Sequence, residues 1–122
     1  MLKIHTKLIA TIVAALLMGS AIGEEKHTHS FSKDIEIFHD VLAPLWHAQA
    51  GQERSQNICE QASKLDQVAR EIHSGDAGEL LKSIDTLMAQ CRSNQSNIDG
   101  TFAHVHDAFH HLVEHKSHAR PQ

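Results

Sequence analysis

Apolar residues recur at steps of three and four along four stretches of this 122-residue chain, which is the spacing of an amphipathic α-helix. The stretches cover about 31–51, 52–73, 76–91 and 101–116, and polar turn residues separate them. Four such helices with short connections favour an all-α fold, namely an antiparallel four-helix bundle. A three-helix bundle with an irregular corner is the alternative.

Pro44 lies inside the first of these stretches. Proline removes one backbone hydrogen bond and clashes with the preceding helical turn. We therefore expect a kink or a break near Leu42 and Ala43. Gly51 then ends the segment or marks a second irregularity.

The first 23 residues have the features of a cleaved signal peptide. Lys3 and Lys7 precede an apolar run over 8–18, and Ala21-Ile22-Gly23 provides a small-x-small cleavage site. The run is shorter than the roughly 20 residues of a membrane span, so we expect no stable membrane insertion. The protein would be periplasmic or secreted, and an uncleaved amino-terminal anchor is the alternative. The mature chain would comprise a flexible arm (24–30), the helical bundle (31–118) and a tail (119–122).

The two cysteines lie at equal distances from Gly75, the centre of the second turn. Facing residues of an antiparallel helical hairpin are equally far from its turn, so Cys59 and Cys91 should meet. An exported protein with two cysteines most often carries one disulfide. The sequence therefore predicts an inter-helix Cys59–Cys91 disulfide, with a thiolate metal pair as the alternative.

Histidine is the unusual component, with 12 residues in the chain. Neutral imidazole is the commonest protein metal ligand, and its charge changes near pH 6.5. The formal net charge of −4 argues against a nucleic-acid partner, because phosphate contacts need clustered Lys and Arg. Composition therefore points to metal or proton chemistry.

His106 and His110 are four residues apart at the border of the apolar face of the last helix. An i, i+4 pair can direct two imidazole nitrogens at one metal ion. His104, His111 and His115 fall on the opposite face, where we expect them to face solvent.

The first helix carries a matching pattern, because Phe38-His39-Asp40 resembles Val105-His106-Asp107. In an antiparallel bundle the first and last helices are neighbours, and His39 falls opposite His110. We therefore expect His39, His106 and His110 to converge, with Asp40 or Asp107 as a further ligand or as an orienting group. His47 faces elsewhere unless a bend at Pro44 redirects it, so it is a secondary candidate ligand. The alternative is that these are half-buried histidines bonded to carboxylates or backbone.

The helix pattern over 31–116 resembles exported four-helix bundles such as cytochrome c-prime and the soluble b-type cytochromes. The chain is also similar in size to small periplasmic metal-resistance and metal-sensing proteins. It has no Cys-x-x-Cys-His, so covalent c-type haem is excluded. The b-type bundles pair a Met on the first helix with a His on the fourth. Here the first helix has no Met, so a b-haem would need two histidines, such as His39 with His106 or His110.

Taken together, the sequence favours a periplasmic metal-binding protein, a buffer, chaperone or sensor for Zn, Cu or Ni, and not an enzyme. One alternative is a His-rich interaction or pH-responsive module that meets a second copy or a periplasmic protein. A bis-His b-haem electron carrier is the third reading. No nucleophile–base arrangement or phosphate-binding loop argues for catalysis.

Overall fold

The computed structural model describes residues 31–118, which form four α-helices. They are α1 (Lys33–His47), α2 (Gln52–Arg70), α3 (Gly78–Ser93) and α4 (Ile98–His118), with a short 3-10 turn, η1 (Gln95–Asn97), before α4. The described residues contain no strand, so the prediction of an all-α fold is confirmed. The predicted signal peptide, arm and tail lie outside the described residues.

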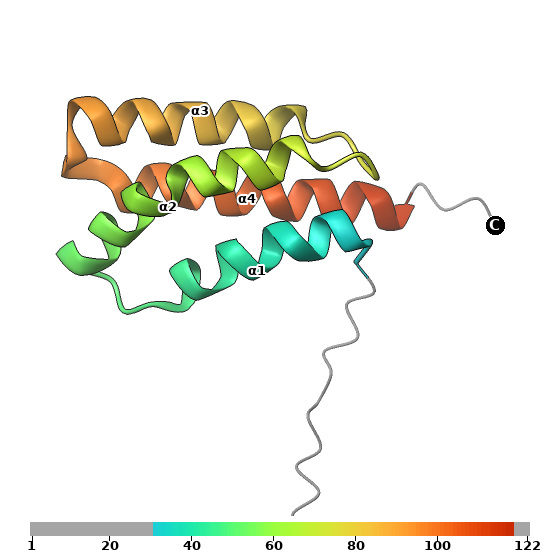
Figure 1. Ribbon diagram of the computed structural model, residues 1–122, viewed down its shortest axis with the longest axis horizontal. Helices are drawn as coiled ribbons and strands as arrows, with labels where there is room; N and C mark the ends of the chain where they lie inside the picture. Colours follow the sequence, from blue (N-terminus) through green and yellow to red (C-terminus); the bar gives the residue numbers. More distant parts are fainter. Residues whose placement is uncertain (1–30, 119–122) are drawn as a thin grey trace, which may run out of the picture.

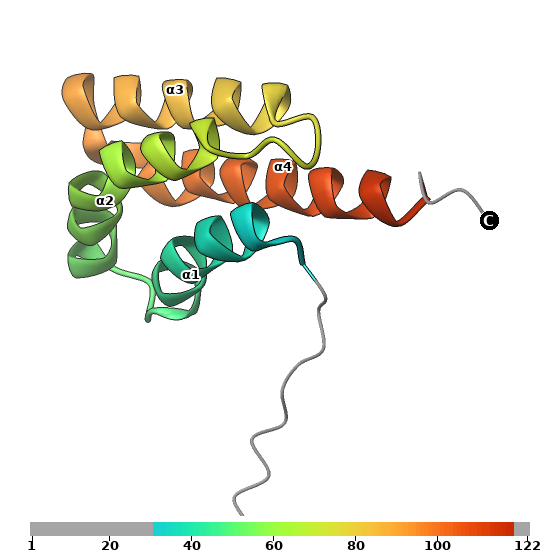
Figure 2. The ribbon, with the colours of Figure 1, turned by 45° about the vertical axis from the view of Figure 1, so that its right-hand side comes forward.

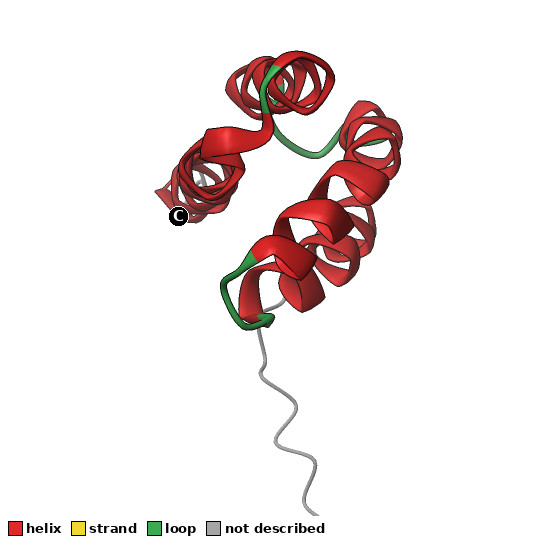
Figure 3. Ribbon diagram, turned by 90° about the vertical axis from the view of Figure 1, so that its left-hand side faces the viewer, coloured by secondary structure: helices red, strands yellow, loops and turns green. Residues whose placement is uncertain are grey.

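Chain direction alternates from helix to helix in Figure 1, where α3 and α4 lie along one another and α1 is inclined to both. The turned view keeps this inclination of α1 (Figure 2). Figure 3 looks nearly along the helices and shows short loops joining them. A regular antiparallel bundle with a kinked first helix stays a prediction.

The hydrophobic core receives side chains from every helix, as the apolar spacing predicts. Its largest fully buried members are Phe38, Phe102, Ile35, Leu42, Ile58, Leu65, Leu80, Ile84, Leu87, Ile98 and Val105. Ile37 is the one large hydrophobic residue exposed on the described surface. The core holds the helices in place, and the rims between them carry the polar groups discussed below.

Pro44 lies within α1, and the helix continues beyond it to His47. The helix therefore does not break near Leu42 and Ala43, and a kink there stays a prediction. Proline deprives the carbonyl of Asp40 of its partner, but Pro44 and Asp40 both face solvent, so water can satisfy this group. Gly51 lies beyond the helix with a φ of 153°, a backbone conformation that side-chain-bearing residues rarely adopt.

The disulfide prediction is confirmed, since Cys59 of α2 and Cys91 of α3 are bonded with a Cα–Cα distance of 5.6 Å. No free cysteine remains in the described residues, which excludes the thiolate metal pair. The bond closes the end of the α2–α3 hairpin far from the loop that joins the two helices. It therefore opposes fraying at that open end.

The loop between α2 and α3 is longer than the sequence suggests, because α2 ends at Arg70 rather than near His73. The carboxylate of Asp34, in the first turn of α1, accepts hydrogen bonds from the backbone N–H groups of His73 and Ser74, both at 2.8 Å. These donors are thus bound to another helix instead of continuing α2. The loop is fastened to α1 by its backbone.

Candidate functional site

A pocket of about 190 Å³ lies between α1 and α4. It is lined by all four of the predicted histidine ligands, His39 and His47 from α1 and His106 and His110 from α4. Aromatic and aliphatic side chains complete its wall, among them Phe31, Trp46, Phe109 and Val113. We refer to this as the His–Trp pocket. Predicted ligands that are far apart in the sequence therefore line one small cavity.

His106 and His110 are the pair that comes into direct contact. Their Nε2 atoms are 3.2 Å apart, and their rings meet edge to face with centroids separated by 4.5 Å. Because the residues are one helical turn apart, the backbone of α4 fixes this relationship. One ring donates a hydrogen bond and the other accepts it, and the tautomers decide which does which.

The ring of His106 lies flat against the indole of Trp46, with centroids 3.7 Å apart and an interplanar angle of 8°. Burial lowers the pKa of His106, and His110 and His47 lower it further, while the nearby carboxylate of Asp107 raises it. His106 is therefore neutral at pH 7, which is the form of imidazole that binds metal.

The other nitrogen of His106, Nδ1, is buried and has no hydrogen-bond partner among the residues that the structure describes. The nearest carboxylate oxygen, Oδ1 of Asp107, is 3.9 Å away, beyond hydrogen-bonding distance. Asp107 is 71% exposed and does not line the His–Trp pocket. It lies on the Nδ1 side of His106, whereas His110 lies on the Nε2 side.

His39 lies among aromatic rings. Its centroid is 5.5 Å from that of Phe31 and 5.8 Å from that of Phe109. His47 is exposed at the carboxyl end of α1, yet it is close enough to His106 to influence its pKa. Both residues thus border the pocket, and among the described residues neither forms a hydrogen bond with His106 or His110.

Within residues 31–118, no group of three or more His, Cys, Asp or Glu side chains is arranged to hold a metal ion. The structure brings together two of the predicted ligands and keeps His39 and His47 at the rim of the same cavity. A third ligand would have to come from a change of side-chain rotamer or from solvent.

Two residues at this site were not singled out from the sequence. They are Trp46 and Arg54. The Arg54 guanidinium lies 5.3 Å from the Trp46 ring centroid, and its Nε donates to the carbonyl of Leu45 at 3.1 Å. An aromatic residue one position from a helix end is only a weak sequence signal for stacking. No sequence signal indicates the contact of Arg54 with Trp46.

None of the described helices is both long and apolar enough to span a membrane. Searches against protein-family models, curated proteins and solved structures found no match.

Proposed function

We propose that this protein is a periplasmic, non-catalytic metal-binding protein that holds a Zn, Cu or Ni ion between His106 and His110. The observation that carries the proposal is the 3.2 Å separation of the two Nε2 atoms. Two nitrogens bound to one tetrahedral ion at about 2.0–2.1 Å are about 3.3–3.4 Å apart. The spacing of the two nitrogens therefore matches that of two imidazole ligands on one ion.

Further ligands are available at the same pocket. His39 and His47 border it from α1, and a rotation of either side chain would add a third nitrogen. The scaffold we propose is the antiparallel four-helix bundle, in which α1 and α4 are neighbours and supply ligands to one groove. Three histidines with one open position suit Zn, Cu or Ni.

Asp107 has an orienting role in this proposal. A small rotation of this exposed carboxylate would bring it within hydrogen-bonding distance of His106 Nδ1, now 3.9 Å away. That bond would keep the proton on Nδ1 and leave the lone pair of Nε2 for the metal. It would also satisfy the one buried histidine nitrogen that lacks a partner.

The size of the pocket favours an ion over haem. Cavities that hold organic ligands usually measure about 300–1,000 Å³, whereas the His–Trp pocket measures about 190 Å³. A b-haem would need α1 and α4 to separate. The second candidate is a pH-responsive interaction module, because protonation of partly buried His106 would place a positive charge against the ring of Trp46.

The test uses Trp46, because it is the only tryptophan in the chain and no tyrosine competes with it. Because His106 is stacked on Trp46, Cu²⁺ or Ni²⁺ bound to His106 should quench the fluorescence of Trp46. The quenching should saturate with a dissociation constant in the micromolar range or tighter. His110→Ala leaves this stacking partner in place and should abolish saturable quenching. His104→Ala removes an exposed histidine of α4 outside the pocket and should leave it unchanged.

Calorimetry on the triple variant His39→Ala/His106→Ala/His110→Ala provides the decisive comparison. His27 and His29 of the amino-terminal arm contribute equally to every variant, so the difference between variants isolates the pocket. Unchanged metal binding by the triple variant would refute the proposal. Metal-independent self-association that follows pH would favour the interaction module instead.

A further inference from the structure

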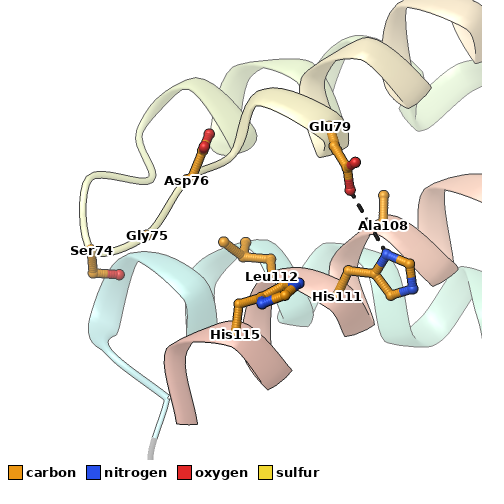
Figure 4. Close-up of a pocket in the computed structure, with 8 residues that line it drawn as sticks. All are labelled: Ser74, Gly75, Asp76, Glu79, Ala108, His111, Leu112 and His115. Atoms are coloured by element: carbon orange, nitrogen blue, oxygen red, sulfur yellow. Dashed lines mark ion pairs between the residues drawn. The ribbon is translucent and has the colours of Figure 1, made fainter. Parts of the chain in front are cut away.

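A second group of titratable side chains lies between α3 and α4, outside the His–Trp pocket. Glu79 of α3 and His111 and His115 of α4 border a separate pocket of about 510 Å³. Ala108 and Leu112 also line it, and the loop over 74–76 closes one end (Figure 4). The sequence predicts that His111 and His115 face solvent, and both are exposed, while the same face of α4 also borders this pocket.

Glu79 and His111 point toward one another across this pocket (Figure 4), with 3.7 Å between Glu79 Oε2 and His111 Nδ1. The side chains are 81% and 62% exposed, so neither is held by packing. His115 lies one turn further along α4 on the same face, beside Leu112. It makes no hydrogen bond or ion pair within the part of the chain that the structure describes.

The approach of the loop to α4 depends on Gly75. A Cβ atom at this position would lie 2.8 Å from Cδ1 of Leu112, closer than carbon atoms pack. Glycine thus lets the loop cross close to α4 just before α3 begins. In the first turn of α3, Glu79 projects over the His111 face of α4 (Figure 4).

From this geometry we infer a second metal site, in which Glu79, His111 and His115 bind a divalent zinc or nickel ion that bridges α3 and α4. An i, i+4 histidine pair with one carboxylate is a ligand set that Zn²⁺ accepts, and water completes the coordination. The side-chain positions of these three described residues do not yet form a metal site, so binding requires them to move. Binding turns the exposed side chains inward, and the carboxylate neutralises part of the ionic charge.

This site differs from the proposed His106–His110 site in position and chemistry. It contains a carboxylate, it is open to solvent, and it does not include Trp46. Occupancy of the two sites can therefore be measured separately, and either site can exist without the other.

Zinc titration calorimetry of the full mature chain at pH 7.5 tests the inference. The variant His111→Ala/His115→Ala should lose one zinc equivalent while its Ni²⁺ quenching of Trp46 stays at the wild-type level. Glu79→Gln should weaken the binding of that zinc equivalent by about tenfold or more. Even the loss of a group that only hydrogen-bonds a metal ligand costs about 10- to 100-fold in metal affinity. His73→Ala removes an exposed histidine outside both pockets and should change nothing.

Two results would overturn the inference. One is an unchanged zinc stoichiometry and affinity in the His111→Ala/His115→Ala variant. The other is a zinc equivalent that is lost in the His111→Ala/His115→Ala variant but binds with unchanged affinity in Glu79→Gln. That result would indicate that zinc binds to histidines of α4 alone. A failure of Ni²⁺ to quench Trp46 in the wild type would count against the His106–His110 site and not against this one.

Discussion

Ser74 donates two hydrogen bonds to Asp34, one from its backbone N–H at 2.8 Å and one from its hydroxyl at 2.7 Å. The backbone N–H of His73 adds a third at 2.8 Å. Partial burial by itself would raise the pKa of Asp34, but these bonds together hold it well below its usual value. Asp34 thus fastens the start of α1 to the α2–α3 loop as a charged acceptor.

Asp34→Ala should lower the free energy of unfolding by about 2–3 kcal/mol, because hydrogen bonds to a charged group contribute about 1.5–3 kcal/mol. Urea unfolding followed by circular dichroism measures the change. Asp40→Ala, at an exposed position of the same helix, should cost less than about 0.5 kcal/mol. Equal losses in the two variants would contradict a specific role for Asp34.

The contribution of Asp34 should also depend on pH. A carboxylate whose pKa is lower in the folded state stabilises the protein fully above its unfolded value of 3.8. This stabilisation is lost as the pH falls below that value, because the unfolded chain then binds a proton at Asp34 that the folded chain does not. The difference between the urea midpoints of the wild type and Asp34→Ala should therefore shrink steadily as the pH falls below about 4.

Removal of the disulfide by Cys59→Ser/Cys91→Ser should reduce stability by about 3–4 kcal/mol, as the bond joins residues 32 positions apart. Urea midpoints with and without dithiothreitol provide the measurement. Reductant should destabilise the wild type by a similar amount and have no effect on the double variant. A wild-type midpoint that is insensitive to full reduction would contradict this prediction.

The sequence was sufficient for the parts of the fold that follow from local periodicity. Apolar spacing located the four helices, and the positions of Cys59 and Cys91 about Gly75 gave their pairing. Pro44 does not break α1, because the carbonyl of Asp40 that it leaves without a partner lies on the exposed side of the helix, where water can satisfy it. The Asp34–Ser74 link was not foreseen, since it joins residues that only the assembled helices bring together.

For the candidate site, too, the sequence predicted the relationships within one helix but not those between helices. Helical spacing was enough to pair His106 with His110, because one helix carries both residues. Their relationship to Trp46 and Arg54 depends on the inclination of α1 and on side-chain rotamers, which spacing does not determine. The spacing predicted that His39 lies opposite His110. It did not indicate that His39 lies among the rings of Phe31 and Phe109, because these contacts also depend on side-chain rotamers.

His106→Phe should make stability less sensitive to mild acid. The lowered pKa of His106 means that the unfolded chain binds a proton near pH 6.5 before the folded one does, so wild-type stability falls as the pH drops through that value. Phenylalanine retains a ring against Trp46 and cannot be protonated. Urea unfolding in the presence of EDTA between pH 7.5 and 5 measures the difference. His104→Phe, at an exposed position of α4, should keep the wild-type slope.

Metal should raise the thermal stability of the wild type, because an ion that binds only the folded chain adds free energy of unfolding. At a free concentration 100 times its dissociation constant, an ion adds about 2.7 kcal/mol, which is about 10–20 °C in Tm for a domain of this size. Zinc at pH 7.5 should produce this shift, and EDTA should reverse it. The shift should fall at pH 5.5, where protons compete for imidazole.

Variants separate the two candidate sites in this experiment. His110→Ala should lose the part of the shift that comes from the His–Trp pocket, and His111→Ala/His115→Ala should lose the part that comes from the α3–α4 site. Because the two sites share no ligand, the two losses should add when the variants are combined. A zinc-induced shift that survives in the combined variant would assign the effect to other histidines of the chain.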